Sequence, residues 1–168
     1  MKPRASAVHT VTLFIILLLV GCATPTSDNS NQSERPFWRG RLALKFEAAQ
    51  GQSGPQSFSA GFELSGNPQT GQLTLYTPLG ITAATLSWSS QNAVLQADGD
   101  TRYFASLDAS IKEVLGTEIP VTALFAWLAG ENMAVVGWQA DLSHHATGRI
   151  TARRTEPGPP VEIRLILD

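Results

Sequence analysis

Apolar and polar residues alternate along much of the chain from Phe37 onward, a pattern typical of β-strands with one buried face and one exposed face. In the first such stretch Trp38 and Leu42 share one parity with other apolar residues, and the opposite parity is mostly charged. Turn signals such as Asp98-Gly99-Asp100 separate the stretches, and 48–56 reads as a loop. The expected strands are 37–47, 57–64, 71–76, 81–89, 94–97 and 101–104. Six short strands joined by tight turns predict an antiparallel meander.

The pattern then changes to helical spacing. Apolar residues from Leu107 to Leu115 recur every three or four positions, with Ser106 as an N-cap and Gly116 as a stop. A second short apolar helix follows Pro120 and ends at Gly130. Three further strands are expected at 135–142, 148–155 and 161–167. A helical insertion within a meandering sheet must lie across one face or one mouth of that sheet.

The N-terminus carries a secretory signal. Leu13 to Cys22 is an unbroken apolar run behind a basic head that contains Lys2 and Arg4, and it is too short to span a bilayer. The last four residues, 19–22, resemble the bacterial lipobox, which implies lipidation of Cys22 and cleavage before it. We therefore expect a signal peptide at 1–21, a lipidated N-terminus and flexible tether at 22–36, and one folded domain at 37–168. Ala23 stands where an Asp retains enteric lipoproteins at the inner membrane, so the expected destination is the outer membrane.

Composition excludes several classes of function. After cleavage the acidic residues outnumber the basic ones, so no electrostatic footprint for nucleic acid is present. With Cys22 used by the anchor, no disulfide is possible. The chain has no G-x-S-x-G elbow, no phosphate-binding glycine loop and no H-E-x-x-H motif. His144 and His145 are neighbours that suit a surface loop better than a metal site, and Asp98 and Asp100 suit a hairpin tip. We expect neither an enzyme nor a metal or other cofactor.

The apolar strand faces leave two interpretations open. In the first interpretation the apolar side chains fill an ordinary core. In the second, the concave face of the sheet is partly unfilled and holds an apolar ligand under the helices. In the second case the cavity is lined by one strand parity and by the helices that cover it. The candidate lining residues are Phe58, Phe62, Leu64, Leu73, Leu75, Leu86, Leu124, Phe125, Leu128, Ile163 and Leu165.

Several motifs resemble those of the LolB family. They are the run from Phe37 to Leu42, the strand around Phe58 to Phe62, the segment 73–80 with its Pro-Leu-Gly turn, and Ile119-Pro120 leading to 127–130. The resemblance covers essentially all of 37–168. It implies a mainly β fold, an unclosed antiparallel β-barrel whose helical lid covers an apolar cavity. It also implies a monomeric outer-membrane receptor that accepts lipoproteins from the periplasmic carrier LolA and inserts them into outer-membrane lipid. The alternative is a membrane-tethered structural lipoprotein with a filled β core.

The turn 77–80 is the most specific local prediction. Pro78 at its second position and Gly80 at its fourth suit a type I turn, which leaves Leu79 at the tip. Leu79 could fold back onto the sheet, yet Tyr76, Pro78 and Ile81 are also apolar. The LolB family carries a protruding Leu in this loop that matters for delivering cargo into the membrane, and the match falls on Leu79. The resemblance thus implies a membrane-insertion loop of Pro78, Leu79 and Gly80.

Overall fold

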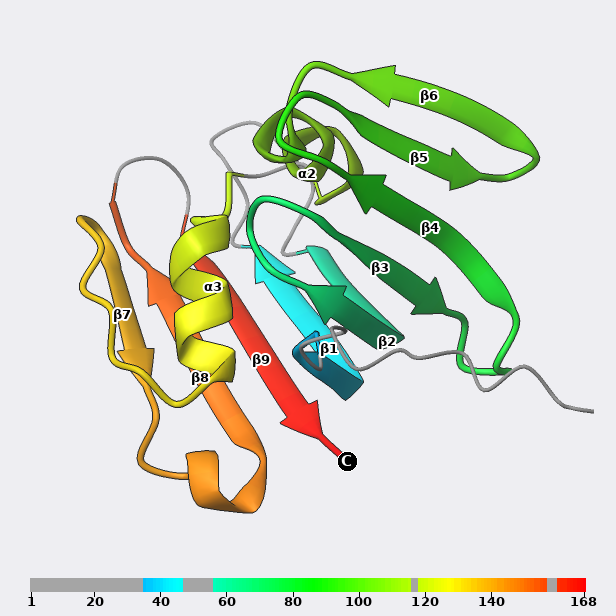
Figure 1. Cartoon of the computed structure of the whole chain (residues 1–168). Coiled ribbons are helices and arrows are strands. Elements are labelled where there is room, and N and C mark those ends of the chain that lie inside the picture. The colour runs from blue at the N-terminus through cyan, green and yellow to red at the C-terminus, as the bar shows by residue number, and fades with distance from the viewer. Residues whose placement is uncertain (1–34, 47–55, 116–117, 157–159) are drawn as a thin grey trace, which may run out of the picture. The chain divides into compact units, whose positions relative to one another are not determined.

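The computed structural model describes residues 35–46, 56–115, 118–156 and 160–168. The signal segment, Cys22, the tether, most of the loop expected at 48–56 and the stop at Gly116 lie outside these residues. Six strands come first: β1 (Phe37–Phe46), β2 (Gln56–Gly66), β3 (Gly71–Tyr76), β4 (Thr82–Trp88), β5 (Ala93–Ala97) and β6 (Asp100–Phe104). Helices α2 (Leu107–Leu115) and α3 (Val121–Leu128) follow, and β7 (Trp138–Asp141), the 3-10 turn η2 (His145–Thr147), β8 (Arg149–Arg154) and β9 (Val161–Leu167) complete the order (Figure 1).

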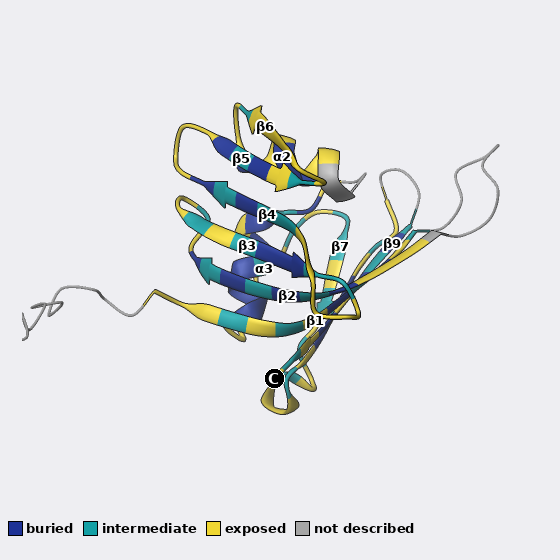
Figure 2. Ribbon diagram, turned by 90° about the vertical axis from the view of Figure 1, so that its right-hand side faces the viewer, coloured by how far each residue is buried: buried dark blue, intermediate teal, exposed yellow. Residues whose placement is uncertain are grey.

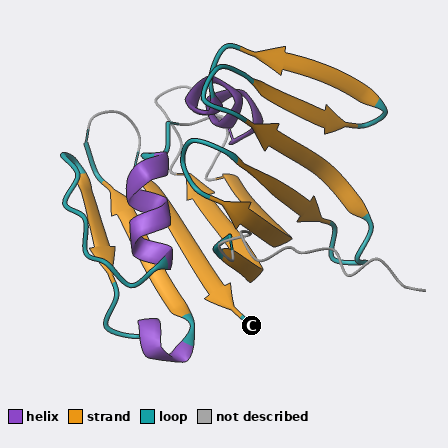
Figure 3. Ribbon diagram, in the orientation of Figure 1, coloured by secondary structure: helices purple, strands orange, loops and turns teal. Residues whose placement is uncertain are grey.

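All nine strands form one antiparallel sheet in the order β6-β5-β4-β3-β2-β1-β9-β8-β7. The first strand and the last strand are neighbours, with Leu42 opposite Leu165 and Leu44 opposite Ile163. The sheet curls strongly but β6 and β7 do not pair, so the barrel is unclosed (Figure 3). The expected fold class is confirmed: an open antiparallel half-barrel with two helices on its inner side.

Local sequence explains the element ends. The Ser106 hydroxyl accepts a hydrogen bond from the Ala109 amide at 3.2 Å, so the expected N-cap of α2 is confirmed. Asp98 and Gly99 both have positive φ, at 54° and 84°. Two successive left-handed residues make the tight hairpin turn that matches strand twist, so this predicted hairpin is also confirmed.

The strand expected at 135–142 is shorter than predicted. Gly137 adopts φ +80°, and the Trp138 amide donates to the Val135 carbonyl at 3.1 Å. This turn leaves the Val136 side chain 95% exposed, and β7 begins only at Trp138. The prediction was wrong here because an apolar Val-Val pair resembles a strand while the following glycine allows a reversal.

The two helices lie against the concave face of the sheet. Figure 2 shows the buried helix α3 behind β2 and β3, and α2 packs on β5 and β6. Ring contacts seat α3: Phe125 lies edge-on to Trp38, with centroids 5.7 Å apart, and edge-on to Trp88, at 6.2 Å. Each such aromatic pair adds about 0.5–1.5 kcal/mol beyond area burial. Helix α3 is therefore held mainly by apolar contact with the sheet.

Candidate functional site

A cavity of about 60 Å³ lies between the concave face of the sheet and the two helices. Its lining side chains are all apolar. The strands contribute Leu42, Phe62, Leu64, Leu73, Leu86, Trp88, Ile163 and Leu165, and the helical segment contributes Leu107, Ile111, Ile119, Val121, Leu124, Phe125 and Leu128. A space of this chemistry excludes water and favours hydrocarbon.

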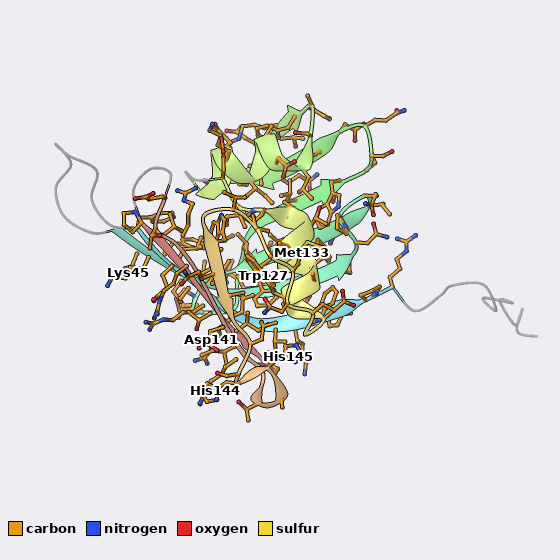
Figure 4. The ribbon with its side chains drawn as sticks, turned by 90° about the vertical axis from the view of Figure 1, so that its left-hand side faces the viewer. Lys45, Trp127, Met133, Asp141, His144 and His145 are labelled. Atoms are coloured by element: carbon orange, nitrogen blue, oxygen red, sulfur yellow. The ribbon has the colours of Figure 1, made fainter. Side chains whose placement is uncertain are left out.

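The roof of the cavity is tied down at few points. No side-chain cap bonds the N-terminus of α3, which follows Pro120. At the other end His145 Nε2 lies 3.0 Å from the Leu128 carbonyl oxygen. Trp127 Nε1 donates to the Met133 carbonyl at 3.0 Å and holds the following loop (Figure 4). Arg154 also donates to the Glu118 carbonyl, just before α3, at 3.4 Å. In the part of the chain that the structure describes, the roof is thus a short apolar helix with polar ties near its C-terminal end and one in the segment that precedes it.

The C-terminal part of α2 carries two ion pairs at the surface. Arg102 of β6 meets Glu113 at 3.0 Å, and Lys112 meets Glu118 at 2.7 Å. The hydrogen bond and the positive charge of Lys112 hold the pKa of Glu118 below its usual value. All four side chains are about half exposed or more, so each pair contributes little to stability.

The turn between β3 and β4 projects an apolar tip. The Gly80 amide donates to the Thr77 carbonyl at 2.8 Å, and Gly80 adopts φ +79°. Leu79 does not have positive φ, which agrees with the predicted type I turn. Its side chain is 86% exposed, and that of Ile81 is 63% exposed. Leu79 therefore does not fold back onto the sheet.

A register shift sits at the base of this turn. Leu75 is opposite Ala84, whereas Tyr76 is opposite Thr82, so Ala83 is an extra residue in β4. Such a bulge bends the strand and increases its twist, and it thereby changes the direction in which the adjoining turn projects. The Tyr76 hydroxyl donates to Glu63 at 2.8 Å, and this bond raises the pKa of Tyr76. The base of the turn is thus fixed while its tip stands in solvent.

The sequence comparisons point to one family. The family model described as "Outer membrane lipoprotein LolB" matches residues 38–159. Proteins named outer-membrane lipoprotein LolB are 31% identical in Bordetella petrii, with 88% of this chain and 85% of that protein covered, and 30% identical in Bordetella pertussis, with 95% and 92% covered. The chain belongs to the LolB family. It is accordingly a lipid-anchored outer-membrane lipoprotein of the Lol system, which localizes lipoproteins.

The structure places the candidate cavity residues of this LolB-family chain in three groups. Nine line the cavity: Phe62, Leu64, Leu73, Leu86, Ile163 and Leu165 from strands, and Leu124, Phe125 and Leu128 from α3. Leu75 lines a neighbouring apolar void of about 20 Å³. Phe58 lies elsewhere, because β3 pairs only with residues 61–66 of β2 and Phe58 falls beyond its end. Its side chain is 40% exposed, and the prediction that it faces the cavity was wrong.

Six lining residues were missed by sequence reasoning. Leu42 and Trp88 share the apolar parity of their strands, so the alternation itself could have included them. Leu107 and Ile111 lie one helical turn apart on α2 and could have been found by period. Ile119 and Val121 flank Pro120, and no periodic signal marks them.

The polar residues considered for chemistry lie away from the cavity. His144 is exposed, and the structure places it before η2, as expected for a surface loop. Asp141 accepts hydrogen bonds from the Ser143 hydroxyl and amide, which lower its pKa. Within 35–46, 56–115, 118–156 and 160–168 no group of three potential metal ligands occurs, and no helix there is long and apolar enough to cross a membrane. For this LolB-family chain the candidate site is the cavity and its rim.

Proposed function

We propose that this protein accepts lipoproteins from the periplasmic carrier LolA into its hydrophobic cavity and inserts them into the outer membrane. The observation that supports this most directly is a wholly apolar cavity roofed by an apolar helix with few polar ties. No covalent bond is made or broken in such a transfer, so the protein acts as a receptor and not as an enzyme. We further propose that it works as a monomer.

The physical need is to keep acyl chains out of water. Exposing three acyl chains at about 0.8 kcal/mol per CH₂ costs on the order of tens of kcal/mol. Passage from one apolar cavity to another avoids that cost and needs no nucleotide. Release into lipid is favourable for the same reason, because the bilayer buries the chains at least as well.

The cavity volume indicates that the helices must move. A cavity of about 60 Å³ is smaller than the ~150 Å³ that accommodates one benzene molecule. Acyl chains therefore require outward displacement of α3, of α2, or of both. The surface ion pairs Lys112–Glu118 and Arg102–Glu113 oppose this movement only weakly, since both are solvent-exposed. A cavity this small corresponds to a closed form of such a receptor.

The remaining assignments complete this proposal. Cys22 is the lipid-modified residue, residues 1–21 form the signal peptide, 22–36 the tether and 37–168 the lipoprotein-binding domain. The turn Pro78-Leu79-Gly80 touches the bilayer and directs cargo into it, consistent with the 86% exposure of Leu79.

One observation favours a second candidate function. Because the resting cavity is small, the inner face could be an ordinary filled core of a membrane-tethered structural lipoprotein. The two candidates differ in whether an apolar ligand enters the domain. A filled core does not take up a hydrophobic probe in a saturable way.

A charged substitution at Leu124 distinguishes the transfer receptor from the structural lipoprotein. Leu124 is half-buried and lines the cavity, whereas Phe58 is an apolar residue outside it. We expect saturable uptake of a hydrophobic fluorescent probe by the unaltered protein, competed by a lipoprotein. Leu124→Glu should abolish uptake while urea unfolding shows a folded domain, and Phe58→Glu should retain uptake. Absence of saturable, competed uptake by the unaltered protein would overturn the transfer function.

A further inference from the structure

The outer, convex face of β1, β9 and β8 is strongly basic although the whole chain is slightly acidic. Residues directly opposite one another in neighbouring strands share a face of the sheet. One row across these strands reads Arg41, Ile166, Arg149, and another reads Lys45, Glu162, Arg153. With Arg39 and Arg164, six cations lie on this face, against the carboxylates of Glu162, Asp168, Asp141 on β7 and Glu63, which is opposite Arg39 on β2.

The rest of the outer face is different. In the described residues of β2 to β6, it carries no lysine or arginine. The cation within those strands, Arg102, is opposite the buried Leu95 and pairs with Glu113 of α2, so it belongs to the inner side. The positive charge is thus confined to one region of one face, which we call the basic face and define by Arg39, Arg41, Lys45, Arg149, Arg153 and Arg164.

Part of this charge is not neutralised. Glu162 accepts from Arg153 Nε at 2.5 Å and from Arg164 Nε at 2.6 Å. Burial acts to raise the pKa of Glu162, but these two guanidinium groups outweigh it and lower the pKa, so the carboxylate stays ionised. Among the residues that the structure describes, Arg41, Lys45 and Arg149 form no ion pair. The basic face therefore presents a net positive charge to solvent.

A shallow depression of about 240 Å³ lies within the basic face. Its centre is Ala43, whose small side chain leaves room between Lys45 on the same strand and Arg164 on β9. Ser57 and Ser59 of β2 form the opposite wall and supply hydroxyl groups. The carboxylate of Glu162 also lines the hollow, but its charge is matched by Arg153 and Arg164. The ammonium group of Lys45 and the two hydroxyl groups therefore remain to donate to a phosphate, which accepts strong charge-assisted hydrogen bonds.

Apolar side chains accompany the cations. Ile166 is 50% exposed on this face between Arg41 and Arg149. Phe58, 40% exposed, lines the edge of the depression but is opposite the buried Leu44 and so belongs to the inner parity of β2. Because β3 ends opposite Gly61, the turn that bears Leu79 projects toward the end of the sheet at which β2 begins. Exposed hydrocarbon beside unpaired cations is the composition of surfaces that lie on anionic membranes.

We propose that the basic face binds the phosphates of anionic phospholipids at the membrane surface, with one phosphate held in the depression beside Ala43. The protein is anchored to a membrane, so the effective concentration of headgroups at this face is high. Lys45 points away from the helices (Figure 4), so such contact leaves the helical roof uncovered. The proposal is independent of cargo transfer, and its test contains no cargo.

Proximity of the basic face to headgroups can be measured on the anchored full chain. A fluorophore attached in a Gln139→Cys variant reports on the edge of the basic face, since Gln139 is exposed opposite Arg153. The same label in a Gln96→Cys variant reports on the uncharged part of the outer face. The unsubstituted protein, treated alike, corrects for labelling at Cys22. The proteins are reconstituted in phosphatidylcholine vesicles with or without phosphatidylglycerol, and lipids with a nitroxide headgroup quench the label.

We expect quenching at position 139 that requires phosphatidylglycerol and decreases with salt, and little quenching at position 96. Arg41→Gln with Lys45→Gln should lower the ratio of docked to undocked protein about thirty-fold, from about a fivefold effect per cation. Arg102→Gln with Lys112→Gln removes the same charge elsewhere and should change little. Equal quenching without phosphatidylglycerol, or no salt dependence in the unaltered sequence, would overturn the proposal. So would unchanged quenching in the variant that lacks the charges of Arg41 and Lys45.

Discussion

The substitution Leu79→Glu should slow the release of cargo into the membrane and leave folding and the acceptance of cargo from the carrier unchanged. The Leu79 side chain is 86% exposed, and the turn that carries it is held by hydrogen bonds among Thr77, Gly80 and Ile81. The substitution should therefore change the free energy of unfolding by less than about 0.5 kcal/mol. Burying a leucine in hydrocarbon is worth about 1.5–3 kcal/mol, and a carboxylate cannot replace it. If that energy contributes to the release step, the rate of cargo release should fall roughly tenfold to a hundredfold.

The assay follows a labelled lipoprotein from the loaded receptor into liposomes. We expect normal acceptance of cargo from the carrier, slow release, and accumulation of the loaded receptor. Val136→Glu is the matched control, because Val136 is an equally exposed apolar residue in a different turn. Release at the normal rate by the Leu79→Glu protein would refute the reasoning, and equal slowing by Val136→Glu would remove its specificity.

Three further predictions concern other parts of the molecule. Cys22→Ala should leave the precursor uncleaved and without lipid, and an unmodified Cys22 in the mature chain by mass spectrometry would contradict the anchor assignment. Phe125→Ala should cost about 3–5 kcal/mol in urea unfolding and enlarge the cavity, so that a hydrophobic probe binds more; weaker binding by a folded variant would count against the cavity. The lowered pKa of Glu162 means that its ionised form contributes stability above its unfolded pKa, and that this is lost as pH falls through the folded pKa. Glu162→Gln should therefore destabilise at neutral pH, with the difference from the unaltered protein shrinking in acid; a difference independent of pH would argue against this.

Much of the fold could be predicted from the sequence. Period-two alternation located β1, β2, β3 and β9, and Ser106 marked the start of α2. These features are local, because a strand face, a cap and a tight turn each depend on residues within a few positions. The Pro78 and Gly80 turn was predicted for the same reason, and the exposure of Leu79 followed from its place at the tip.

The site depended on pairings that local patterns do not contain. Phe58 has the parity of a core residue, but its exposure was decided by where β3 ends along β2. The cations of the basic face are spread over three strands, and they come together only because β9 returns to pair with β1. The volume left beneath Phe125 depends on how its ring meets Trp38 and Trp88. Alternation along the chain tells which face of a strand is buried, whereas register and helix placement, set by packing between distant segments, decide what that face encloses.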